Sequence, residues 1–195
     1  MPGSRTTYVP AERLVGWLER FEASQGALEF LPDNDGIRVR AASGAEARLL
    51  GPWPADGRPG RGANDVERLA SLAGQARTLG LVLARRGGYA VGVAREGRLL
   101  ASKTGSSNSR RANAADALAG TVAEQAATLF GSAAPEYLVF GGDRMLAEQV
   151  AGRRELARWA GLPRLRPLDV PDPKAAVLEQ AARDAVSVVI RITLP

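Results

Sequence analysis

The residues best suited to chemistry are basic side chains around a short polar stretch. Lys103 precedes the run Gly105, Ser106, Ser107, Asn108 and Ser109, and Arg110 and Arg111 follow it. An arginine pair just before a predicted helix is mildly unfavourable to the helix dipole, so helix stability does not explain it. Guanidinium groups bind phosphate through paired hydrogen bonds. The pattern predicts either a loop that faces a nucleic acid backbone or an ordinary solvated basic surface.

A second basic pair, Arg85 and Arg86, lies at the turn between two predicted strands. Successive turns alternate between the two ends of a sheet, so the sequence leaves open whether this pair lies near Lys103. If the basic surface binds nucleic acid, we predict that the residues contacting its backbone are Lys103, Arg110, Arg111, Arg85 and Arg86. The net charge of +5 has two open explanations, which are a phosphate-rich partner and a genome that favours arginine codons.

The sequence contains no histidine and no cysteine. This excludes Ser-His-Asp triads, Cys-His dyads and zinc sites built from these residues. Any catalysis must use carboxylates, lysine, tyrosine, amides or the backbone. We expect no metal and no cofactor.

Carboxylates are also poorly placed for a two-metal nuclease. The first strand of the predicted sheet, residues 81–85, has no acidic residue. The following helix offers Asp116 and Glu124, and the fourth strand offers only Glu136 at its start. The charge needed to hold two divalent cations is missing.

Gly141, Gly142 and Asp143 lie between a predicted strand and a predicted helix. Glycines here can admit a phosphate to a helix N-terminus. The Lys-Ser/Thr of a P-loop is absent, so we favour a tight turn with Asp143 as the helix cap.

The elements that must position these residues follow from hydrophobic periodicity. Strands are predicted at residues 81–85, 89–94, 98–103, 137–140 and 186–193, with an extended segment at 165–170. Helices are predicted at residues 113–130, after Asp143 and at 171–184. A three-stranded meander followed by alternating helices and strands indicates an α/β fold with a ribonuclease H-like mixed sheet flanked by helices.

The first 50 residues predict a small α+β appendage, with a helix at 10–23 and strands at 27–31, 37–41 and 46–50. Residues 51–62 are rich in proline and glycine and are interpreted as a linker, or as an ordered functional loop. A helix capped by Asn64 and Glu67 and ending at Gly80 follows. The predicted domains are therefore residues 1–50, the linker 51–62, and residues 63–195.

No apolar run is long enough to span a bilayer, and the first residues lack a signal-peptide pattern. We expect a cytoplasmic protein that is a monomer and does not bind membranes.

Four runs carry a family resemblance: GGYAVGVAREGRLLASKTG, RRANAADAL, YLVFGGDR and LDVPDPKAAVLEQAARDA. In this order they resemble the actinobacterial Vms-like release factors, which are similar to the middle domain of archaeal and eukaryotic class I release factors. The resemblance covers most of the chain from residue 80 onward. It implies the release-factor middle-domain type of fold, and hydrolysis of the ester that joins the nascent chain to tRNA. The implied partners are the large ribosomal subunit and the tRNA acceptor end.

The sequence departs from this family at the catalytic loop. Family members carry a Gly-Gly-x-Ser-Gln core between the third strand and the next helix, but here no glutamine lies between Arg86 and Gln125. No catalytic residue is retained, so we expect peptidyl-tRNA hydrolysis to be absent or impaired. The short loop is either an excision or a natural loss. The alternatives of another class are a non-catalytic ribosome- or RNA-binding module of the same fold and a protein–protein adaptor.

Overall fold

The computed structural model describes residues 3–33, 36–106 and 114–195. The chain forms two compact units. Unit 1 combines residues 1–75 with residues 186–195, and unit 2 is residues 76–185.

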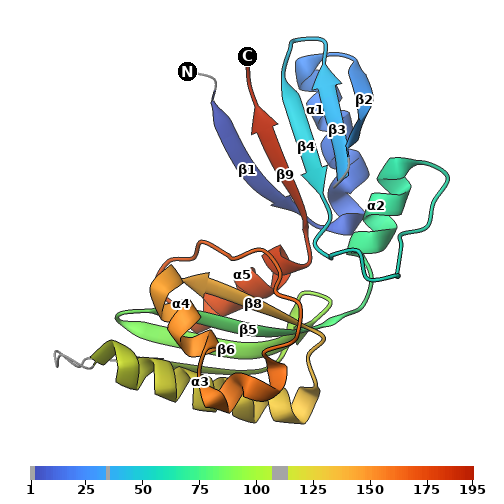
Figure 1. Cartoon of the computed structure of the whole chain (residues 1–195). Coiled ribbons are helices and arrows are strands. Elements are labelled where there is room, and N and C mark those ends of the chain that lie inside the picture. The colour runs from blue at the N-terminus through green and yellow to red at the C-terminus, as the bar shows by residue number, and fades with distance from the viewer. Residues whose placement is uncertain (1–2, 34–35, 107–113) are drawn as a thin grey trace. The chain divides into compact units, whose positions relative to one another are not determined.

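Unit 2 contains a mixed four-stranded sheet of β5 (Thr78–Arg85), β6 (Gly88–Arg95), β7 (Arg98–Ser106) and β8 (Tyr137–Gly142), in the order β7-β6-β5-β8. The first three strands are antiparallel, and β8 is parallel to β5. This is the strand arrangement expected of a ribonuclease H-like sheet, and the predicted fold class is confirmed (Figure 1).

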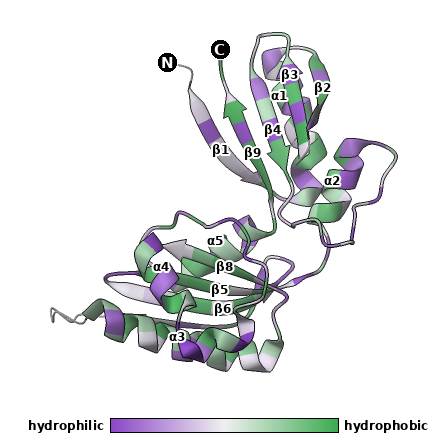
Figure 2. Cartoon of the chain, in the orientation of Figure 1, coloured by the Kyte–Doolittle hydropathy of each residue, from purple (hydrophilic) through white to green (hydrophobic). Residues whose placement is uncertain are grey.

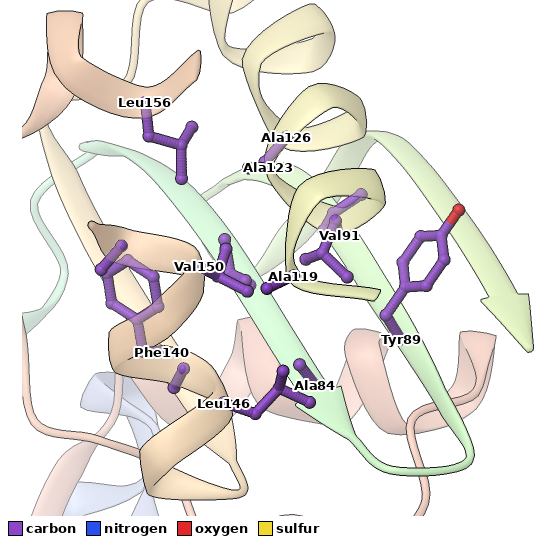
Figure 3. Close-up of a cluster of buried hydrophobic side chains, with 14 of the residues drawn as sticks. Ala84, Tyr89, Val91, Ala119, Ala123, Ala126, Phe140, Leu146, Val150 and Leu156 are labelled. Atoms are coloured by element: carbon purple, nitrogen blue, oxygen red, sulfur yellow. The ribbon is translucent and has the colours of Figure 1, made fainter. Parts of the chain in front are cut away.

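Helices cover both faces of this sheet. The helices of unit 2 are α3 (Ala114–Ala133), α4 (Arg144–Ala151), the 3-10 helix η2 (Arg154–Trp159) and α5 (Ala175–Ala185). Side chains from α3, α4 and η2 join Tyr89, Val91 and Phe140 in one buried core (Figure 3). On the opposite face Leu178 of α5 lies 3.0 Å from the position of a Cβ on Gly92, so the small residues of β6 let this helix pack closely. Hydrophobic residues dominate β5 and β6, which are buried almost throughout (Figure 2).

Unit 1 contains a five-stranded antiparallel sheet in the order β1-β9-β4-β3-β2. Its elements are β1 (Ser4–Val9), η1 (Ala11–Arg13), α1 (Leu14–Gln25), β2 (Leu28–Asp33), β3 (Gly36–Ala41), β4 (Glu46–Leu50), α2 (Asp65–Ala73) and β9 (Val188–Thr193). The buried side chains of α1 and α2 pack with those of β3, β4 and β9 on one face of the sheet.

The final strand forms where its alternation predicts it, but it joins a different sheet. As β9 it pairs with β1 and β4 in unit 1 rather than with the strands of unit 2. Its buried residues Ile190 and Ile192 share a core with Leu14 of α1. The extended segment at 165–170 forms one isolated parallel bridge with β8, between Leu168 and Gly141.

Two details around residues 51–80 differ from the prediction. The helix capped by Asn64 ends at Ala73, and Gly80 lies inside β5, where a Cβ would meet the Phe130 ring at 2.6 Å. The proline- and glycine-rich segment packs against α2. There the Arg61 amide donates to the Ser71 hydroxyl at 3.1 Å.

Candidate functional site

Two hairpin reversals bring the end of β7 back to the end of β5. Arg85 lies opposite Gly88, and Gly88 lies opposite Ser106. The Arg85-Arg86 turn and the exit of β7 therefore share one end of the unit 2 sheet. The sequence leaves open whether the Arg85-Arg86 turn lies near Lys103, and the strand register places this turn at the end of β7 that lies three residues beyond Lys103.

β8 adds a further basic residue to this end of the sheet. It runs parallel to β5 with Gly142 opposite Ala84, so α4 begins at the same end. Arg144, at the start of α4, is exposed. We call Arg85, Arg86 and Arg144 the basic edge. Sequence reasoning missed Arg144, although the helix predicted to begin after Asp143 was a signal that could have found it.

The charges of the basic edge are only partly balanced. Arg85 has a long ion pair with Asp169, at 3.4 Å. Arg86 and Arg144 are exposed, and neither forms an ion pair within residues 3–33, 36–106 and 114–195. Exposed arginines without a carboxylate partner are suited to binding phosphate.

The remaining predicted residues lie on β7 or beyond it. Lys103 is exposed on β7 opposite Val91, three residues before the strand ends. Gly105 lies opposite Tyr89, whose ring occupies the space that a side chain at position 105 would need, and Ser106 is the exposed last residue of β7. Ser107, Asn108, Ser109, Arg110 and Arg111 lie outside the described residues.

The turn at Gly141, Gly142 and Asp143 is a helix cap, as predicted. The Asp143 carboxylate accepts a hydrogen bond from the Leu146 amide at 3.0 Å. The Gly142 amide donates to the Leu168 carbonyl and the Asp143 amide to the Ala84 carbonyl, at 3.2 and 2.8 Å. These two amides are therefore engaged within the fold and are not directed at a phosphate.

The carboxylates considered for metal binding have structural partners. Asp116 forms an ion pair with Arg153 at 2.5 Å, and Glu136 accepts a hydrogen bond from the Thr78 amide at 3.0 Å. In the part of the chain that the structure describes, no three such side chains cluster as they would around a metal ion.

The family model of the Actinobacteria/chloroflexi VLRF1 release factor matches residues 108–191. The predicted resemblance to the actinobacterial release factors is confirmed. The match begins in the connection between β7 and α3 and extends into β9.

Among solved structures, Thermus thermophilus RuvC bound to a Holliday junction is similar at 15% identity. That match covers 56% of this chain and 90% of RuvC, with a TM-score of 0.40. Archaeoglobus fulgidus Pelota is similar at 13% identity, covering 95% of this chain and 63% of Pelota, with a TM-score of 0.36. No curated protein matches the chain. Among the described residues, no helix has the length and hydropathy of a membrane span.

Proposed function

We propose that this chain binds the ribosome in translation termination or in the rescue of stalled ribosomes. The connection from β7 to α3 would face the acceptor end of the tRNA. The observation that carries the proposal is the match of residues 108–191 to a release-factor family, because that match begins within this connection.

The basic edge supports an RNA partner. Arg85, Arg86 and Arg144 lie at the end of the sheet from which β7 exits. Arg110 and Arg111 add two further arginines to the connection itself. Together they provide guanidinium groups that would bind RNA phosphates if this connection enters a site lined by RNA.

Hydrolysis of the peptidyl ester needs a water molecule held against the carbonyl carbon, together with hydrogen-bond donors for the developing oxyanion. Residues 105–111 supply hydroxyls, one amide and two guanidinium groups, but no glutamine. We propose that the chain binds the ribosome and releases peptide very slowly.

Single-turnover release from peptidyl-tRNA in stalled bacterial ribosomes tests this proposal. The chain is compared with a variant that carries a grafted Gly-Gly-x-Ser-Gln loop between Gly105 and Arg110. We expect the grafted variant to release peptide at least tenfold faster than the chain as written. Rapid release by the ungrafted chain would contradict the proposed impairment.

A non-catalytic ribosome-binding module is the second candidate, favoured by arginines that remain where the glutamine core is absent. If this candidate is correct, the chain binds the ribosome, but the variant with the grafted loop does not release peptide. Ribosome co-sedimentation with the double variant Arg86→Gln/Arg144→Gln tests the shared binding step, and we expect roughly tenfold weaker binding. The matched control is Arg95→Gln/Arg98→Gln, two exposed arginines paired at the opposite end of the same sheet. If both double variants lost ribosome affinity equally, the loss would reflect total charge, and the basic edge would not be a specific ribosome-binding surface.

A further inference from the structure

Three arginines lie side by side on the open face of the unit 1 sheet. Arg38 of β3 lies opposite Arg48 of β4, and Arg48 lies opposite Arg191 of β9. Their strands are neighbours in the sheet, and α1 and α2 pack on its other face. We call Arg38, Arg48 and Arg191 the arginine row.

This arrangement is unfavourable in the absence of a partner. Like charges directly opposite each other on adjacent strands destabilise a sheet. Arg48 is held by Asp33 through two hydrogen bonds, of 2.6 and 2.8 Å. Arg38 and Arg191 are exposed and have no ion pair among the residues the structure describes. The row therefore keeps positive charge that the described part of unit 1 does not neutralise.

Asp33 fixes the central member of the row. Its own cross-strand neighbour on the intervening strand β3 is Gly36, which has no side chain to obstruct the contact from Asp33 on β2 to Arg48 on β4. The bidentate contact holds the planar guanidinium of Arg48 in one orientation, which reduces the conformational entropy lost when an anion binds.

The row lines an open groove of about 680 Å³ on this face. Ser4 and Thr193 add hydroxyl groups at one side, and the only carboxylates among the described residues of the lining are Asp33 and Glu46. Glu46 accepts a hydrogen bond from Arg40 at 2.9 Å, so both carboxylates are paired with arginine. The described lining contains no aromatic ring on which a base could stack.

We propose that the arginine row binds the phosphate backbone of RNA without reading its sequence. Strands lie about 4.8 Å apart, so the row extends over about 10 Å. That length is enough for the row to contact more than one phosphate of a nucleic acid strand. A single inorganic phosphate would engage only part of this row. The choice of RNA over DNA rests on the proposed ribosomal function, but the affinity for a phosphate backbone does not.

The test is fluorescence anisotropy of a labelled single-stranded RNA 20-mer with the full chain, repeated over a range of salt concentrations. The double variant Arg38→Gln/Arg191→Gln removes the two members of the row without an ion pair in the described structure. We expect its affinity to fall at least tenfold. The slope of log affinity against log salt should become shallower by about 1.4, because each phosphate that is no longer neutralised reduces the slope by about 0.7.

The matched control is Arg13→Gln/Arg20→Gln, which removes the same charge from exposed positions on η1 and α1. Its affinity should change less than twofold. An equal fall in both variants, or no RNA binding by the parent chain, would overturn the proposal. Displacement of the RNA by low millimolar inorganic phosphate would also overturn it, in favour of a small-anion site. DNA of the same sequence is the second ligand, and tighter binding of DNA than of RNA would overturn the choice of RNA.

The melting temperature of the row variant separates misfolding from weaker binding. Removal of the like-charge pairs should leave this temperature unchanged or raise it. The assay uses free RNA and no ribosome. It can therefore fail while the grafted chain still releases peptide, and release can fail while the row still binds RNA.

Discussion

The ring of Tyr89 lies where a side chain at position 105 would have to go. A Cβ on Gly105 would clash with the Cε1 atom of Tyr89, and Tyr89 is itself buried against α3. Only glycine at position 105 lets β7 pass this ring next to its exit from the sheet. Tyr89 projects from β6 toward the neighbouring strand β7 (Figure 3).

Gly105→Ala should lower the free energy of unfolding by about 1–3 kcal/mol, because the Tyr89 ring must leave its packed position. Urea denaturation measures the change. The matched control is Gly87→Ala, since a Cβ there meets nothing within 4 Å and the site is exposed. Equal costs at both positions would show that removal of glycine, rather than contact with Tyr89, is responsible.

Tyr137→Phe should also destabilise the fold. Arg77 is fully buried and donates a hydrogen bond of 2.8 Å to the Tyr137 hydroxyl. Loss of an acceptor from a buried guanidinium costs about 1–3 kcal/mol. The control is Tyr89→Phe, which removes a hydroxyl that forms no hydrogen bond within the described residues. A loss of less than about 0.5 kcal/mol of unfolding free energy in Tyr137→Phe would mean that the other interactions of Arg77 are enough to keep its buried guanidinium stable.

Asp143→Ala should destabilise α4 by about 0.5–2 kcal/mol, because the Leu146 amide loses its capping acceptor. Asp143→Asn keeps an oxygen acceptor at the same place and should cost much less. Thermal unfolding of both variants checks this prediction. If the two variants were destabilised equally, the charge of Asp143 would matter more than its cap.

The stability of the chain should depend on the protonation of Asp184. Burial raises the pKa of this carboxyl above its ordinary value of 3.8, against a hydrogen bond from Gln180 and the charge of Arg183. The folded state therefore holds the proton more tightly than the unfolded state. This contribution is complete below the unfolded pKa and is lost as pH rises through the higher folded pKa.

Asp184→Asn should therefore raise the free energy of unfolding at pH 7, with an advantage that shrinks as the pH falls toward 3.8. Urea titrations at several pH values measure this advantage. The pKa of Glu155 is shifted in the opposite direction. A backbone hydrogen bond, followed by interactions with Arg154, lowers the pKa of this carboxyl. Glu155→Gln should show no such gain at neutral pH, and an identical profile for both variants would exclude Asp184 as the source.

Local patterns predicted the elements of unit 2 well. Hydrophobic periodicity predicted strands at 81–85, 89–94 and 137–140, and these lie within β5, β6 and β8. These predictions are correct because a strand that is buried on both faces consists almost entirely of hydrophobic residues, which can be recognised in the sequence. The Asp143 cap and the Asn64 cap were also predictable, since each needs only one side chain and a nearby amide.

The pairing between strands that are distant in the sequence could not be predicted from such local patterns. Residues 4–9 are mostly polar and exposed, so β1 left no periodic signal. The alternation of buried and exposed residues in β9 predicts a strand, but it does not indicate with which strands β9 pairs. Likewise Arg38, Arg48 and Arg191 are far apart in the sequence, and only the strand register brings them into one row.

The placement of β9 has a consequence for how the chain is made. β9 lies between β1 and β4, whereas the whole of unit 2, from residue 76 to residue 185, is synthesised before it. On a translating ribosome unit 2 can complete its core while the sheet of unit 1 still has a gap at this position. Domains generally fold as units during synthesis, so unit 1 is the part that must wait for the last strand to emerge. Until then β1 and β4 each expose an unpaired edge that a chaperone or a neighbouring nascent chain can bind.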